Sequence, residues 1–228
     1  MQLRISQYTS FAFILFQLAF FSCGQKAAEN NSAPVEENGK SAPIKENKTI
    51  LFFGNSLTAG YGVEPEESFA GIIQHRIDSL GLDYQVINGG LSGETTASGL
   101  NRLDWFVDEE PYIFILELGG NDGLRGIGVS ETRKNLKKII ELIQEKYPET
   151  TILLAGMQIP PNMGAEYSRA FREIFADLAK EESIQLIPFL LEGVAGDPSL
   201  NLPDGIHPSE KGHRIVAETV WDYLKPLL

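Results

Sequence analysis

Three residues of this 228-residue chain have side chains that could together cleave an acyl bond: Ser56, Asp204 and His207. A serine hydroxyl becomes a useful nucleophile when an imidazole takes its proton, and a carboxylate on the other ring nitrogen fixes the tautomer of that imidazole. Asp204 and His207 stand three residues apart in the segment Asp-Gly-Ile-His-Pro, so one short turn could present both. The pattern predicts acyl transfer by a serine nucleophile.

Each of these residues also has a purely structural interpretation. Ser56 follows Gly54 by two positions, where a serine commonly occupies a turn or caps a helix. His207 could be a surface or capping residue, which is the interpretation that fits His75 and His213 because both lie inside helical patterns. The choice therefore depends on the elements that position these residues.

A serine nucleophile needs hydrogen-bond donors for the oxyanion that forms on its substrate, each typically worth about 10²- to 10³-fold in rate. The candidates are the backbone N–H groups of Ser56 and Gly93 and the side-chain amide of Asn121. A glycine lets backbone approach a ligand closely, although Gly93 could also be an ordinary turn residue. The elbow Gly-x-Ser-x-Gly does not surround Ser56, because Thr58 replaces the second glycine, and this favours a class other than the α/β-hydrolases.

Short apolar or β-branched segments alternate with helical patterns from residue 48 onward. The predicted strands are 49–53, 84–88, 112–118, 151–155 and 185–187, and the predicted helices are 68–80, 96–107, 130–146, 166–182 and 209–224. This alternation predicts one domain with a parallel sheet covered on both faces. All the candidate residues follow strands, so they could converge at one edge of the sheet. Pro208 suits the first position of the last helix.

The composition is that of an ordinary globular domain with a modest extension, since 43% of the residues are hydrophobic and 22% are charged. A net charge of -12 argues against binding nucleic-acid phosphates. Three histidines and one cysteine nearly exclude a His/Cys metal cluster, and no carboxylate-only metal site is indicated. We expect neither a metal nor another cofactor.

The first 47 residues differ in character from the rest. Residues 1–22 contain an apolar run at 11–21 that is too short to span a bilayer of roughly 30 Å, and they predict a secretory signal. Cys23 follows directly, which is similar to a bacterial lipoprotein signal, although Phe20 stands where leucine is usual. An incidental cysteine in an ordinary secretion signal is the alternative. Residues 23–47 lack aromatic side chains and predict a flexible linker to a domain at 48–228.

Four of these segments together resemble the SGNH/GDSL hydrolase family, whose blocks supply serine, glycine, asparagine and histidine in this order. The matches are Ser56 in Phe-Gly-Asn-Ser-Leu, Gly93 in Leu-Ser-Gly-Glu-Thr, Asn121 in Leu-Gly-Gly-Asn-Asp-Gly and His207 in Asp-Gly-Ile-His-Pro. The chain looks most similar to the bacterial subgroup of periplasmic thioesterases, lysophospholipases and arylesterases. One departure is Asn55, because the first block usually has aspartate there. We expect activity to survive this change, with altered local hydrogen bonding or pH profile.

The resemblance implies a flavodoxin-like three-layer α/β/α sandwich with about five parallel strands. It implies a nucleophile at Ser56, a base and an acid at His207 and Asp204, and oxyanion donors at Ser56, Gly93 and Asn121. Residues 158–164 resemble the family's mobile acyl-contacting loop, which implies substrate contacts from the three side chains Ile159, Pro160 and Met163. A rigid proline-containing loop is the alternative interpretation of that segment.

The expected function is hydrolysis of small acyl esters or thioesters, such as lysophospholipids, by an enzyme held at a bacterial membrane through lipidated Cys23, facing the periplasm or the cell surface. Two alternatives stay open. One is a carbohydrate O-acetylesterase, and the other is a lipid- or glycan-binding lipoprotein that keeps the fold without turnover. The sequence leaves the oligomeric state open.

Overall fold

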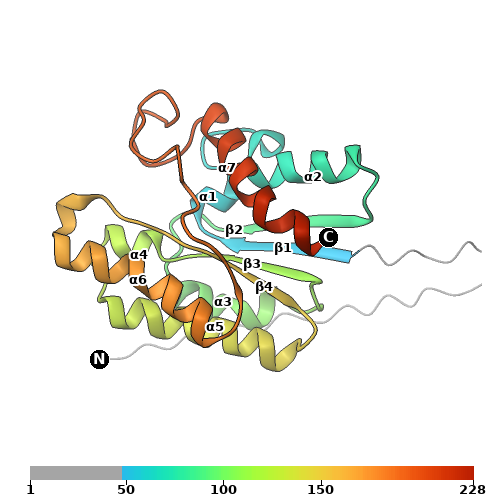
Figure 1. Ribbon diagram of the computed structural model, residues 1–228, viewed down its shortest axis with the longest axis horizontal. Coiled ribbons are helices and arrows are strands. Elements are labelled where there is room, and N and C mark those ends of the chain that lie inside the picture. Colours follow the sequence, from blue (N-terminus) through green and yellow to red (C-terminus); the bar gives the residue numbers. More distant parts are fainter. Residues whose placement is uncertain (1–47) are drawn as a thin grey trace, which may run out of the picture. The chain divides into compact units, whose positions relative to one another are not determined.

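The computed structural model describes residues 48–228 as a central sheet with helices on both faces (Figure 1). The expected signal peptide at 1–22, the expected lipidation site Cys23 and the expected linker at 23–47 lie outside the described residues. Within residues 48–228, no helix combines the length and the apolar character needed to cross a membrane.

Five parallel strands form the sheet in the order β2-β1-β3-β4-β5. They are β1 (Lys48–Gly54), β2 (Tyr84–Gly90), β3 (Ile113–Glu117), β4 (Thr151–Ala155) and β5 (Gln185–Ile187). From β1 the chain first adds β2 on one side and then β3 on the other, so the strand order reverses between β1 and β3. Ligands of open parallel sheets bind outside the carboxyl ends of the strands at such a reversal.

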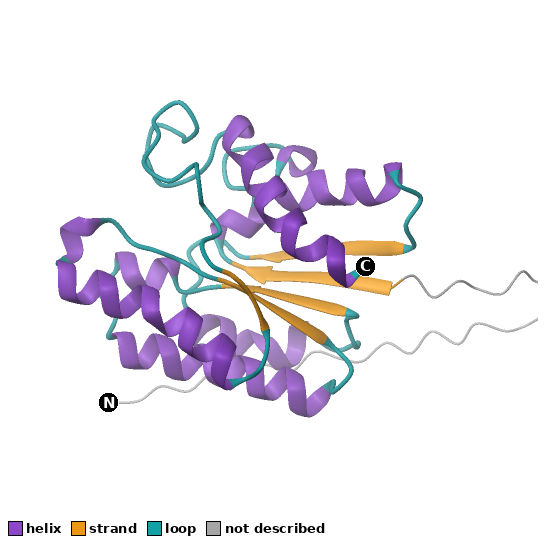
Figure 2. Ribbon diagram, in the orientation of Figure 1, coloured by secondary structure: helices purple, strands orange, loops and turns teal. Residues whose placement is uncertain are grey.

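Helices cover both faces of the sheet because its central strands are apolar on both sides. The helices are α1 (Ser56–Ala59), α2 (Phe69–Ser79), α3 (Thr96–Phe106), α4 (Gly120–Leu124), α5 (Val129–Lys146), α6 (Ala165–Glu181) and α7 (Glu210–Leu224), with 3-10 turns at Pro65–Glu67, Pro161–Met163 and Lys225–Leu227. Helices α2 and α7 pack together on one face, and α3, α5 and α6 lie on the other (Figure 2). The expected three-layer sandwich is confirmed.

The predicted strands and long helices are confirmed to within two residues at each end. Two short helices, α1 and α4, were not predicted, because four or five residues are too few to show a helical period. The prediction for Pro208 was wrong. Ser209 is the N-cap of α7, since its side chain accepts the Gly212 N–H, and Pro208 lies before it in a bridge with Asn201.

The surface interpretation of His213 was also wrong, whereas the capping interpretation agrees with the structure, because His213 accepts the first N–H of α2. His213 is only 1% exposed, and its Nδ1 accepts the Phe69 N–H at 3.2 Å, with the two rings stacked. Its position inside a helical pattern did not reveal this, because α7 turns that side chain towards α2. His75, by contrast, is exposed on α2.

Candidate active site

Ser56, His207 and Asp204 are joined by two hydrogen bonds. His207 Nε2 lies 2.8 Å from Ser56 Oγ, and His207 Nδ1 lies 2.7 Å from Asp204 Oδ2. Ser56 is the first residue of α1, directly beyond the end of β1 (Figure 1), while the other two come from the loop between β5 and α7. Ser56 is near the start of the domain's sequence, and Asp204 and His207 are near its end. Folding therefore brings together three side chains that are distant in sequence.

The Asp204 carboxylate is oriented by its own turn. Its Oδ1 accepts the backbone N–H groups of Ile206 at 2.9 Å and His207 at 3.0 Å, which leaves Oδ2 for the imidazole. Burial opposes ionisation of this carboxyl, but the hydrogen bonds from the His207 backbone and ring outweigh burial and lower the pKa of Asp204 to about 2. An ionised Asp204 accepts Nδ1–H, so His207 Nε2 is free to accept the Ser56 hydroxyl proton.

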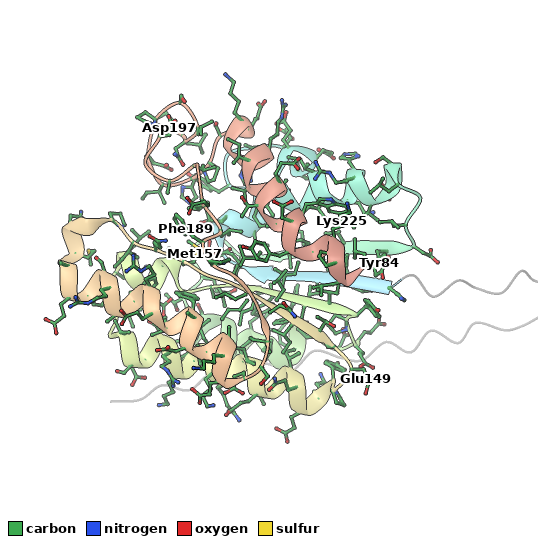
Figure 3. The ribbon with its side chains drawn as sticks, in the orientation of Figure 1. Tyr84, Glu149, Met157, Phe189, Asp197 and Lys225 are labelled. Atoms are coloured by element: carbon green, nitrogen blue, oxygen red, sulfur yellow. The ribbon has the colours of Figure 1, made fainter. Side chains whose placement is uncertain are left out.

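The loop between β5 and α7 carries this turn at its far end. The Leu202 N–H donates to the His207 carbonyl at 2.7 Å, and Asn201 Nδ2 donates to the carbonyls of Val194 and Asp197. Figure 3 shows Asp197 on the projecting part of this loop, and Met157 and Phe189 where the chain leaves β4 and β5. Bonds within the loop therefore hold the turn that presents Asp204 and His207.

Tyr61 covers the imidazole and was not singled out from the sequence. Its ring centroid lies 4.6 Å from that of His207, and its backbone N–H donates to the Ser56 carbonyl at 3.0 Å. Tyr61 is half exposed, and its ring packs against the imidazole at an interplanar angle of 41°. The signal that could have found it is its position shortly after Ser56, in Ser-Leu-Thr-Ala-Gly-Tyr.

Asn55 caps the short helix that begins with Ser56. Its Oδ1 accepts the Leu57 N–H at 3.0 Å, and its Nδ2 donates to Glu117 Oε1 at 2.7 Å. Glu117, at the end of β3, is 1% exposed and also accepts hydrogen bonds from Thr58. Burial raises the pKa of Glu117 to about 7, against the opposing effect of these hydrogen bonds. Sequence reasoning missed Glu117, whose only signal is a carboxylate ending an otherwise apolar strand.

The other candidate oxyanion donors are Gly93, in the loop before α3, and Asn121, in the short helix α4, and these two segments contact each other. Asn121 Nδ2 donates to the Glu94 carbonyl at 3.0 Å, which leaves the second N–H of that amide for another acceptor. Gly93 has a φ of +82°, a conformation that favours glycine. Within residues 48–228, the backbone N–H groups of Ser56 and Gly93 have no hydrogen-bond acceptor. Both can therefore donate to a bound substrate.

A buried ion pair fixes the loop that carries Gly93. Arg102 donates through Nε to Glu94 Oε1 at 2.8 Å and through Nη2 to Glu94 Oε2 at 2.5 Å and to the Gly89 carbonyl at 2.9 Å. Its guanidinium lies over the Phe53 ring, 4.1 Å from the centroid. Two-point pairing of arginine with a carboxylate holds both groups in one geometry. This pair, also missed from the sequence, connects the Gly93 loop to the sheet.

The structure places two of the three expected acyl-contacting side chains beside α4, the helix of Asn121, and the turn that follows it. Ile159 lies against Gly123, where a Cβ would come within 2.3 Å of Ile159 Cγ2, and Met163 Cε lies 3.6 Å from the Cβ position of Gly126. Pro160 is exposed. An open depression of about 510 Å³ adjoins Met163, and none of its lining residues belongs to the Ser56–His207–Asp204 chain.

The described residues contain no group of three or more His, Cys, Asp or Glu side chains placed to hold a metal ion.

The residues of this site lie within a region that is similar to known proteins. The GDSL-like lipase/acylhydrolase family matches residues 52–215. Esterase TesA of Pseudomonas aeruginosa is 38% identical over 182 residues, which is 79% of this chain and 90% of that protein. Thioesterase 1/protease 1/lysophospholipase L1 of Escherichia coli K12 is 34% identical over 79% of this chain and 85% of its own length. The crystal structure of TesA superposes with a TM-score of 0.76 at 38% identity, covering 79% of this chain and 100% of that one.

Proposed function

The chain belongs to the GDSL-like lipase/acylhydrolase family, and we propose that it hydrolyses acyl esters and thioesters through an acyl-enzyme on Ser56. The single observation that carries this proposal is the continuous hydrogen-bond chain from Ser56 through His207 to Asp204. The names of its relatives, esterase, thioesterase and lysophospholipase, support small acyl esters, thioesters and lysophospholipids as substrates.

In the first half of the proposed reaction, Ser56 Oγ attacks the carbonyl carbon while His207 Nε2 takes the hydroxyl proton. Asp204 stabilises the imidazolium that forms. The negative charge on the carbonyl oxygen is held by the N–H groups of Ser56 and Gly93 and by the Asn121 amide. His207 then gives its proton to the departing alkoxide or thiolate, and the acyl group remains on Ser56.

In the second half, water takes the place of the leaving group. His207 removes a proton from this water, the hydroxide adds to the acyl carbonyl, and the carboxylic acid departs as His207 returns the proton to Ser56 Oγ. Ile159 and Met163 are assigned to the acyl site because both lie beside α4, the helix of Asn121, or the turn after it, and Pro160 is exposed next to them.

The test compares the wild type with Ser56→Ala on p-nitrophenyl esters of increasing acyl length at neutral pH. We expect kcat/KM to fall by about 10³-fold or more, because removal of the nucleophile leaves only binding and the oxyanion donors. Ser79→Ala is the matched control, since Ser79 is exposed at the end of α2 and bonds only the Arg76 carbonyl.

The acyl-length profile separates the alternatives. A preference for octanoyl over acetyl esters supports the long-acyl esterase, whereas activity confined to acetyl esters indicates a carbohydrate O-acetylesterase. Equal, background rates for wild type and Ser56→Ala on oxygen esters, thioesters and lysophospholipids would leave the non-catalytic binding protein as the better explanation.

We also propose that the enzyme resides in the bacterial cell envelope, facing the periplasm or the cell surface, on a lipid anchor at Cys23. Support comes from the apolar run at 11–21 that ends just before the only cysteine of the chain. Residues 1–22 would be removed, and 23–47 would link the anchor to the domain at 48–228. Replacing Cys23→Ser should release the protein from the membrane fraction, and unchanged fractionation would contradict the anchor.

A further inference from the structure

We propose that the buried ion pair between Arg102 and Glu94 positions the oxyanion donors of this site, with Arg102 as a positioning residue for ester hydrolysis. The donors concerned are the Gly93 N–H and the Asn121 amide. The inference rests on the proposed role of Ser56 and extends it to a side chain that acts through a loop. Arg102 is 6% exposed and Glu94 is 3% exposed. Buried pairs of this kind often add little net stability, so a positional role is the better account of this one.

Gly93 lies in a tight turn that is attached at both ends. The Glu94 N–H donates to the Leu91 carbonyl at 3.1 Å and closes the turn. Gly93, its third residue, has a φ of +82°, whereas the φ of Ser92 is not positive, which is the pattern of a type II turn. At the first end, the Leu91 N–H donates to the Gly54 carbonyl of β1 at 2.9 Å. The direction of the Gly93 N–H therefore also depends on what holds the second end, Glu94.

Arg102 holds this second end through three hydrogen bonds. Its Nε donates to Glu94 Oε1 at 2.8 Å, and its Nη2 donates to Glu94 Oε2 at 2.5 Å. The same Nη2 donates to the Gly89 carbonyl at 2.9 Å, and Gly89 belongs to β2. The guanidinium thus ties the turn to the neighbouring strand. Glu94 cannot swing away without leaving two buried charges unpaired.

Two aromatic rings fix the plane of the guanidinium. Its carbon lies 4.1 Å from the centroid of the Phe53 ring and 4.5 Å from that of the Phe106 ring. Phe53 is a buried residue of β1, and Phe106 is the last residue of α3. The rings therefore orient the planar fork of Arg102 towards Glu94. A lysine would keep the charge but would have neither the flat faces nor the two-point contact.

Glu94 also orients the second donor. Asn121 Nδ2 donates to the Glu94 carbonyl at 3.0 Å, which leaves the other N–H of that amide for a substrate oxygen. Gly93 and Glu94 share a peptide bond, so a shift of Glu94 moves both donors together. Arg125 adds another contact, since its Nη2 donates to the Gly93 carbonyl at 3.0 Å, but this bond is exposed and water can replace it.

Removing the guanidinium, as Arg102→Met, should release the turn. We expect kcat to fall by about 10- to 100-fold with little change in KM, because a misplacement of about 1 Å can cost about 10²-fold and the oxyanion donors act mainly on the transition state. The unfolding temperature should fall by about 10 °C, since Glu94 would stay buried without its partner. Arg102→Lys keeps part of the pair and should lose about three- to tenfold in kcat.

A double variant separates positioning from stability. Glu94→Met/Arg102→Met replaces the pair by apolar side chains of similar length, and such a replacement of a buried ion pair is often neutral for stability. We expect the unfolding temperature to return to within about 3 °C of wild type, while kcat stays within about threefold of that of Arg102→Met. A purely structural pair would recover both properties together.

The affinity for octyl trifluoromethyl ketone reports on the oxyanion donors. Ser56 Oγ adds to the ketone carbon, the hydroxyl proton passes to His207 Nε2, and the carbonyl π electrons become the lone pair of an alkoxide held by those donors. The Ki of this ketone should rise by about the factor by which kcat/KM falls, because an analogue of the transition state loses the same interactions.

The experiment uses the full chain and measures kcat and KM on p-nitrophenyl octanoate, Ki for the ketone, and thermal unfolding. Arg76→Met is the matched control. Arg76 donates to both carboxylate oxygens of Glu218 and lies over the Trp221 ring, so it also forms a two-point pair beside an aromatic side chain. This pair joins α2 to α7 and is not attached to the Gly93 turn, so kcat and Ki should stay within about twofold of wild type.

Wild-type kcat in folded Arg102→Met or in the folded double variant, or a lowered kcat with wild-type Ki, would overturn the proposal. If Arg102→Met fails to fold, the double variant decides by this criterion, and if neither folds, Arg102→Lys decides by it. Equal rates for wild type and Ser56→Ala would instead contradict the proposed function, so the two failures are distinguishable.

Discussion

Two carboxylates serve the same serine from opposite environments. The side chain of Asp204 is 37% exposed on a surface loop, whereas Glu117 is 1% exposed at the end of a buried strand. At Asp204 hydrogen bonds outweigh burial and lower the pKa to about 2, while at Glu117 burial outweighs four hydrogen bonds and raises the pKa to about 7. We therefore propose that location decides the role: the exposed acid orients His207, the proposed base, and the buried acid holds the backbone of the turn that carries Ser56.

The largest effect should follow from changing the exposed acid, as Asp204→Asn. The backbone N–H groups of Ile206 and His207 would hold the asparagine oxygen, so its NH₂ group would face His207 Nδ1. The imidazole would then carry its proton on Nε2 and could not accept the Ser56 proton. We expect kcat to fall by about 10³- to 10⁴-fold, measured on p-nitrophenyl octanoate.

Asp197→Asn is the matched control for this prediction. Asp197 belongs to the same loop and forms a similar turn, and its carboxylate accepts the Ser199 N–H at 2.8 Å and the Ser199 hydroxyl at 2.7 Å, away from the hydrogen bonds that join Ser56, His207 and Asp204. Its replacement should leave kcat near wild type. A loss at Asp204 no larger than the loss at Asp197 would mean that the exposed acid acts only on loop structure.

The buried groups His213 and Glu117 should each make the stability of the folded protein depend on pH. Burial lowers the pKa of His213 to about 4 from an ordinary value of 6.5, and the nearby charge of His207 lowers it further. As the pH falls, His213 is therefore protonated in the unfolded chain before it is protonated in the folded chain. The stability from a neutral His213 is present above pH 6.5 and is lost as the pH falls towards 4. His213→Asn keeps an acceptor for the Phe69 N–H without ionising, and should reduce this slope by up to about 1.4 kcal/mol per pH unit.

Glu117 should lower the stability of the folded protein as the pH rises, over a pH range that overlaps that of His213. Because its pKa is raised in the folded chain, its contribution to stability is present below pH 4.5 and is lost as the pH rises through about 7.

Urea unfolding of wild type, His213→Asn and the exposed control His75→Asn from pH 4 to 8 checks the His213 prediction. Identical slopes for wild type and His213→Asn would show that the histidine is not held neutral by burial.

The smallest effect should come from changing Ile159 and Met163, the side chains assigned to the acyl site. Ile159→Ala and Met163→Ala remove apolar surface from the proposed acyl site, so the ratio of kcat/KM for octanoyl over acetyl esters should fall by about tenfold or less. Leu82→Ala, an exposed change in the turn between α2 and β2, is the control. If both variants keep the wild-type chain-length preference, Ile159 and Met163 do not contact the acyl group.

The strands and long helices could be predicted because their signals are local. The apolar run of β1 and the periodic apolar positions of α5 depend on neighbours within a few residues. Pro208 shows the limit of local reasoning: proline suits the start of a helix, but the bridge between Asn201 and Pro208 moves the N-cap to Ser209. Glu117 shows the same limit, because its four donors come from residues about 60 positions away.

The amino-acid sequence by itself determined the alternating architecture, the edge of the sheet at which the polar loops gather, and the identity of the residues that could attack and stabilise an acyl group. Periodicity and residue type carry that information. Only the tertiary structure decided that His207 meets Ser56 at 2.8 Å, that Tyr61 covers the imidazole, and that the Asn55 side chain donates to Glu117. Such contacts join residues distant in sequence, and their distances and burial arise only when the strands pack side by side.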